Sequence, residues 1–160
     1  MSGESLNFSQ QKYFISPRDV RPVHLIGAGS VGSHIASMLA RIGVTDLTAW
    51  DHDSIDSHNI GPSLYGMQDF GKYKVDALSE ILLRDTGVAI KRERRMYDGE
   101  RLKGTIICAV DSMEARQMLW KRARKENGRC TPRLALTGNR PQGARPERLV
   151  GFFCRRAHGA

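Results

Sequence analysis

Residues 23–32 read Val-His-Leu-Ile-Gly-Ala-Gly-Ser-Val-Gly, a short apolar run that passes directly into a glycine-rich turn. The run Val23–Ile26 is typical of a buried parallel strand. Apolar side chains then recur at helical spacing, at Val31, Ile35, Met38, Leu39 and Ile42. The stretch therefore predicts a strand, a tight turn and a helix, and Gly43 marks the end of that helix.

The turn fits the pattern G-x-G-x-x-G, with its glycines at Gly27, Gly29 and Gly32. Glycines at this spacing allow a tight turn and let a phosphate approach the backbone, while the helix N-terminus offers free N–H groups and a positive dipole. Asp51 lies 19 residues after Gly32, where an acidic side chain can accept hydrogen bonds from ribose hydroxyls. The pattern therefore predicts a nucleotide or dinucleotide site.

Strand and helix signals alternate along the rest of the chain. We expect strands over 44–50, 88–94 and 105–110, a loop over 54–71, and helices over 72–85 and 112–126. The polar composition of 88–94 places that strand near a sheet edge. This alternation predicts an α/β fold with a mostly parallel sheet and helices on both of its faces.

Length and composition exclude several classes of protein. The chain has 160 residues, 40% of them hydrophobic, which is enough for one compact domain. It has no apolar run near the roughly 18 residues of a membrane span and no secretory signal at its start. Its three cysteines form no C-x-x-C pair, which argues against a disulfide scaffold or a structural zinc site. A cytoplasmic location is the default expectation.

The positive charge of the chain is unevenly distributed. The net charge is +8, but residues 128–160 hold seven arginines and a single acidic residue, and the preceding 127 residues are nearly neutral. Nucleic-acid binding is therefore not expected of the body of the protein and could involve only the tail.

Further polar residues follow the predicted strands in a family-like order. Asp51-x-Asp53 is followed by Asn59, then by Gly71-x-x-Lys74, and Asp111-Ser112 stands after the strand at 105–110. Together with the glycine turn, this arrangement resembles the ThiF/MoeB family, bacterial relatives of the ubiquitin-activating enzymes. The resemblance covers roughly residues 20–127 and implies a Rossmann-like fold.

The resemblance also implies a reaction. Members of this family use ATP and magnesium to adenylate the C-terminal carboxylate of a ubiquitin-like or sulfur-carrier protein. The carboxylate attacks the α-phosphate of ATP, pyrophosphate leaves and an acyl adenylate remains. Such chemistry brings two anions together, so cationic and N–H groups must offset the charge that develops on the oxygens. A homodimer is the expected assembly.

By the same resemblance, the glycine turn would line the phosphates through Gly27, Gly29, Ser30 and Gly32, and Asp51 would hold the ribose. These residues form the first half of the implied site.

The second half of the implied site lies further along the chain. Asn59 and Lys74 would contact the triphosphate, and Asp111 would bind magnesium, whose preferred ligands are oxygen atoms. Asp53 fits the family pattern, and Arg116 would support the loop or the nucleotide. From residue type alone, Lys74 could instead be a solvated lysine and Asp111 a helix cap.

The chain departs from the family at one position of chemical importance. After the asparagine the family reads Leu-Gln-Arg-Gln, and that arginine contacts the phosphates, whereas here the run is Asn59-Ile-Gly-Pro-Ser63 with Pro62 in its place. Arg18 or Arg21 could substitute for it. Two alternatives therefore stay open: an NAD(P)-binding Rossmann module, and a non-catalytic partner subunit of an activating enzyme.

The composition divides the chain into an arm over 1–20, a nucleotide-binding domain over 21–127 and an Arg-rich tail over 128–160. Because the family continues here into further core strands, we expect a truncated or frame-shifted product whose sheet is incomplete at its C-terminus. The alternative is a genuine basic tail that binds nucleic acid or a partner. An incomplete sheet predicts marginal stability unless a dimer covers it.

Overall fold

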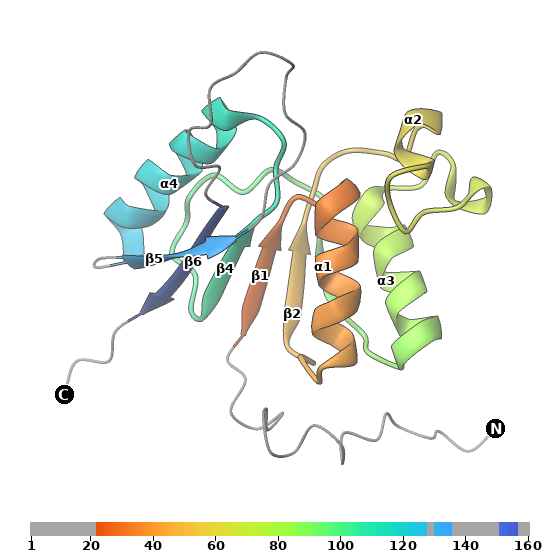
Figure 1. Ribbon diagram of the computed structural model, residues 1–160, viewed down its shortest axis with the longest axis horizontal. Helices are drawn as coiled ribbons and strands as arrows, with labels where there is room; N and C mark the ends of the chain where they lie inside the picture. The colour runs from red at the N-terminus through yellow and green to blue at the C-terminus, as the bar shows by residue number, and fades with distance from the viewer. Residues whose placement is uncertain (1–21, 128–129, 136–150, 157–160) are drawn as a thin grey trace.

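The computed structural model describes residues 22–127, 130–135 and 151–156, and its centre is a six-stranded sheet of order β3-β2-β1-β4-β6-β5 (Figure 1). The strands are β1 Val23–Ile26, β2 Leu47–Trp50, β3 Lys91–Glu93, β4 Thr105–Cys108, β5 Cys130–Ala135 and β6 Gly151–Arg156. The first four strands pair in parallel, with β3 at the edge, as the sequence predicts. Strand β6 pairs antiparallel with both β4 and β5.

The helices follow the strands in the predicted order. They are α1 Ser30–Arg41, α2 Ser57–Ile60, the 3-10 helix η3 Met67–Asp69, α3 Lys74–Thr86 and α4 Met113–Asn127. Helix α3 ends where the sequence indicates, because Gly87 adopts a left-handed φ of 69° and donates its N–H to the Leu83 carbonyl. The short helices α2 and η3 lie within the stretch expected to be a loop.

Helices cover both faces of the sheet, which confirms the predicted layers (Figure 1). On one face, α1 and α3 pack on alternate strand residues, among them Leu25, Ala49 and Ile107. On the other face, Leu119 of α4 packs with a second set of buried residues, at Ile26, Trp50, Tyr97 and Ile106. Since successive strand residues point to opposite faces, β1, β2 and β4 each contribute to both cores.

The strand register brings the ends of three strands to one edge. Ile26 of β1 pairs with Trp50 of β2 and with Cys108 of β4, so all three strands end at the same level. The chain leaves β1 toward β2 on one side and later returns to β4 on the other. In open α/β sheets, ligands bind at this edge, where the strand order reverses.

The sequence predicts no strand after residue 127, and the structure adds β5 and β6 there. The N-terminal arm, with Arg18 and Arg21, lies outside the described residues, as do 128–129, 136–150 and 157–160 of the tail. Among the helices of the described ranges, none combines the length and the apolar character that a bilayer crossing requires.

Candidate functional site

The glycine turn joins β1 to α1 in a space that excludes side chains. Gly27 has a φ of 93°, and a Cβ atom there would lie 2.9 Å from the carbonyl carbon and oxygen of Ala109. A Cβ atom on Gly32 would overlap the carbonyl oxygen of Gly27. The first and third glycines of the pattern therefore allow α1 to pack against the ends of β1 and β4.

Replacing Gly32 by alanine should lower the free energy of unfolding by at least about 3 kcal/mol, because the new methyl group meets backbone that cannot move aside. Gly29→Ala is the matched control. A Cβ atom at Gly29 meets nothing within 4 Å, so this change should cost less than about 1 kcal/mol. Urea unfolding of both variants measures the difference. Equal losses in the free energy of unfolding would contradict the prediction that Gly32 is required for packing.

The N-terminus of α1 is open for an anion. Gly29 is the N-cap and supplies no side-chain cap, and the space beside its Cα is empty of protein atoms among the described residues. The first hydrogen bond of the helix runs from the Ser33 N–H to the Gly29 carbonyl, which leaves the N–H groups of the first turn without helical partners. The arrangement offers these N–H groups and the positive helix end to a negatively charged ligand.

Asp51 lies beside this turn, directly after β2. Its Oδ2 accepts a hydrogen bond from the Ala28 N–H at 2.7 Å, and its Oδ1 accepts one from the Asp53 N–H at 2.9 Å. The carboxylate therefore fixes the backbone of the glycine turn. Because a carboxylate has about four acceptor positions, it can also accept hydrogen bonds from a ligand.

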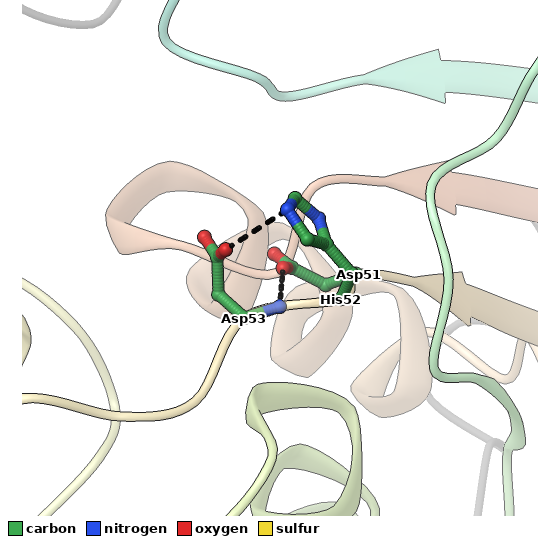
Figure 2. A group of neighbouring side chains, drawn as sticks. All are labelled: Asp51, His52 and Asp53. Carbon is green, nitrogen blue, oxygen red and sulfur yellow. Dashed lines mark hydrogen bonds and ion pairs between the residues drawn. The ribbon is translucent and has the colours of Figure 1, made fainter.

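Asp53 and Lys74 form an ion pair. Lys74 is the first residue of α3, its side chain is only 10% exposed, and its Nζ donates to Asp53 Oδ2 at 2.7 Å. This hydrogen bond from Lys74 is the main reason that the pKa of Asp53 lies below its usual value, and partial burial opposes it. The nearby His52 Nε2 lies 3.3 Å from Asp53 Oδ1 (Figure 2).

The stability that Asp53 contributes should depend on pH. A carboxyl group whose folded pKa is lowered stabilises the fold above its unfolded pKa, here 3.8, and loses that effect as the pH falls through the folded value. Wild type should therefore exceed Asp53→Asn in stability at pH 7, and the difference should shrink below pH 3.8. Urea unfolding between pH 7 and 3 measures this, and a difference that stays constant would contradict it.

Figure 2 shows Asp51, His52 and Asp53 side by side, and their ligand atoms all lie within 4.8 Å of one another. The sequence analysis did not predict this grouping. Protein groups already engage it, since both oxygens of Asp51 accept backbone N–H groups and Asp53 is paired with Lys74. Asp51 therefore supports the glycine turn and Asp53 holds Lys74, while His52 lies against Asp53.

Asn59 lies in α2, on the loop that faces the start of α1. Its Oδ1 accepts the N–H of Asp56 and so caps the short helix. Two further bonds attach the loop to α1: the Ser30 hydroxyl donates to the Pro62 carbonyl at 2.8 Å, and the Leu64 N–H donates to the Ser33 hydroxyl at 3.2 Å. Thus Pro62, which stands in place of the family arginine, contributes its carbonyl oxygen to this contact.

Asp111 is an exposed residue three positions after the end of β4. It is not the cap of α4, because the Ser112 hydroxyl accepts the Ala115 N–H at 3.1 Å. The buried Arg116 donates through Nε to the Val110 carbonyl at 2.6 Å, so it supports the loop that carries Asp111. Within the described ranges, no hydrogen bond or ion pair engages the Asp111 carboxylate, which suits a hard cation such as Mg²⁺.

The structure thus joins the glycine turn to Asp51, and Asp53 to Lys74, by direct contacts. Asn59 and Asp111 lie at the same edge without a described contact to these groups. Sequence reasoning missed Tyr65, whose buried hydroxyl lies within hydrogen-bond distance of the Ala28 and Lys74 carbonyl oxygens. The sequence offers no distinctive signal for it, because the same loop also holds Leu64, Met67 and Phe70.

The chain is similar to curated enzymes over most of its length. It is 27% identical over 156 residues to ubiquitin-like modifier-activating enzyme 5 of Branchiostoma floridae, a match that covers 82% of this chain and 38% of that protein. The enzyme of the same name from Caenorhabditis elegans is 27% identical over 127 residues, covering 67% of this chain and 30% of that protein. The chain therefore spans between 30% and 38% of the length of these relatives.

Solved structures share the fold. The crystal structure of PaaA matches with a TM-score of 0.55 and 25% identity, covering 65% of this chain and 34% of PaaA. TcdA (CsdL) matches with a TM-score of 0.58 and 20% identity, covering 64% of this chain and 44% of TcdA. The model of the ThiF family matches residues 18–130, which include every site residue named above. The chain belongs to the ThiF family.

Proposed function

We propose that the protein binds ATP with magnesium and transfers the AMP group to the C-terminal carboxylate of a ubiquitin-like or sulfur-carrier protein. A carboxylate oxygen attacks the α-phosphorus, the bond from that phosphorus to the oxygen bridging to the β-phosphate breaks, and pyrophosphate leaves with the electron pair. Membership of the ThiF family and the similarity to ubiquitin-like modifier-activating enzyme 5 support this reaction class.

The single observation that carries the proposal is the uncapped start of α1 at the sheet edge, beside Asp51. Backbone N–H groups of Gly29, Ser30 and Gly32 would bind phosphate oxygens, the turn at Gly27 would let them approach, and Asp51 would accept hydrogen bonds from the ribose.

Lys74 supports phosphate binding as well. A lysine ammonium group has three N–H donors, and the contact with Asp53 uses one of them. The amine can therefore meet a phosphate oxygen while it stays paired with Asp53. Asn59 uses only its Oδ1 among the described contacts, so its side-chain N–H groups are available to the triphosphate.

The donor set fits magnesium at Asp111, because an exposed carboxylate without a described partner is a hard oxygen ligand. A magnesium ion bound there would neutralise charge on the phosphate oxygens. The protein's own contribution is to hold Asp111 at the end of β4, through the Ser112 cap and the Arg116 contact with the Val110 carbonyl.

Two measurements test the proposal. Calorimetry with MgATP and with NAD⁺ should show binding of MgATP alone, and pyrophosphate exchange into ATP should appear when a cognate ubiquitin-like or sulfur-carrier protein is added. Binding of NAD⁺ instead of MgATP would indicate an NAD(P)-binding module. Binding of MgATP without exchange across a panel of the host's carrier proteins would indicate a non-catalytic partner subunit. Light scattering tests the proposed homodimer.

A further inference from the structure

Tyr65 joins two segments of the proposed nucleotide site. Its side chain is buried, with 3% of the residue exposed, on the loop between α2 and η3. The hydroxyl lies within hydrogen-bond distance of the Ala28 carbonyl oxygen in the glycine turn, and 3.2 Å from the Lys74 carbonyl oxygen at the start of α3. These two carbonyl groups belong to segments 46 positions apart in the chain.

The Ala28 backbone is held through both its N–H and its carbonyl group. Its N–H donates to Asp51 Oδ2 at 2.7 Å, and its carbonyl oxygen accepts from Tyr65. Ala28 is fully buried, so water does not replace either partner. One carboxylate and one phenol therefore hold the glycine turn at Ala28, in addition to the backbone hydrogen bond from the Gly27 N–H to the Trp50 carbonyl.

The Lys74 backbone is held in the same way. Its N–H donates to the Asp53 carbonyl at 3.0 Å, and its carbonyl oxygen shares the single proton of the Tyr65 hydroxyl with the Ala28 carbonyl oxygen in a three-centre hydrogen bond. Burial, with the negative charges of Asp51 and Asp69, raises the pKa of Tyr65 far above its usual range. The phenol therefore stays protonated and remains a donor at neutral pH.

We propose that Tyr65 is a positioning residue: its hydroxyl sets the spacing between the glycine turn and Lys74, so that both reach the same triphosphate. This inference rests on the proposed function, and the Tyr65 side chain itself touches no reacting atom. It explains why an aromatic residue with a polar tip occupies a buried position where its ring alone would satisfy packing.

Tyr65→Phe removes only the hydroxyl, and Tyr97→Phe is its matched control. Tyr97 is equally buried at 3%, and its hydroxyl also donates to a backbone carbonyl, that of Glu100 at 2.7 Å, on the opposite face of the sheet. Both variants should lose a similar amount of stability. Only Tyr65→Phe should weaken MgATP binding, by about tenfold in calorimetry, because it releases two segments of the site.

Hydrogen exchange without nucleotide separates the two proposals. In Tyr65→Phe, the backbone amides of Ala28 and Lys74 should exchange faster than in wild type, whereas Tyr97→Phe should leave both unchanged. Unchanged exchange at both amides in Tyr65→Phe would overturn the positioning role, whether or not the protein binds ATP. Equal MgATP affinity in the two variants would also overturn it. A wild-type protein that binds no MgATP would instead contradict the proposed function.

Discussion

Replacing Lys74 by methionine should lower pyrophosphate exchange into ATP about 100-fold, since in the proposed site it removes a buried cation from beside the phosphate oxygens, where charge develops. Methionine keeps most of the apolar stem, which packs at the start of α3. Asp53 loses its partner but is about half exposed, so water can solvate it. The free energy of unfolding should therefore change by no more than about 1 kcal/mol.

Lys72→Met is the matched control for this prediction. Lys72 lies two residues earlier and also makes ion pairs, with Asp69 at 3.3 Å and with Glu80 at 2.7 Å. It is a partly exposed lysine, and none of its described contacts is with the glycine turn or with Asp53. Exchange in Lys72→Met should stay within about twofold of wild type. If the two variants lose exchange equally, the effect belongs to general surface charge and not to a phosphate contact.

Much of the fold follows from local signals in the sequence. The strand at 23–26, the glycine turn and the helix after it have a continuous pattern of apolar spacing that no other secondary structure satisfies. Gly87 marks the end of α3 because a left-handed residue is needed there. The two cores on opposite faces of the sheet follow from the alternation of strands and helices.

Short and polar elements were not predictable in the same way. Helix α2 spans only Ser57–Ile60, which is too short for a periodic pattern. Its one signal is a capping pair, in which Asn59 stands three residues after Asp56. Strands β5 and β6 contain Pro132 and several arginines, which do not resemble the apolar runs of the central strands.

The remaining contacts of the site could not be predicted from the sequence, because they join segments that are far apart in the chain. The sequence indicates that Asp51, Asp53 and Lys74 lie at one sheet edge, but it does not show that Asp53 rather than Asp111 pairs with Lys74. Which carboxylate pairs with Lys74 depends on where α3 begins relative to the end of β2. The start of α3 lies beside Asp53, because the Lys74 N–H also donates to the Asp53 carbonyl. The contacts of the Tyr65 hydroxyl were not predictable for the same reason, because its two acceptors come from segments that meet only in the folded chain.

Asp111→Asn should raise the magnesium concentration for half-maximal pyrophosphate exchange by about 100-fold, since the amide keeps the shape of the side chain but loses the charge that binds a divalent cation. Stability should stay within about 0.5 kcal/mol of wild type, because Asp111 is exposed and Ser112, not Asp111, caps α4. The experiment is a magnesium titration at fixed ATP.

Glu114→Gln is the matched control, because Glu114 is an exposed carboxylate only three residues later, in the first turn of α4. The hydrogen bonds from its own backbone N–H and from the Ser112 hydroxyl lower the pKa of Glu114, so it carries its charge at neutral pH. Both substitutions remove one negative charge near the start of α4. If Glu114→Gln raises the magnesium concentration for half-maximal exchange as much as Asp111→Asn does, Asp111 acts only through its negative charge and not as a ligand. A shift confined to Asp111→Asn is the result expected of a direct ligand.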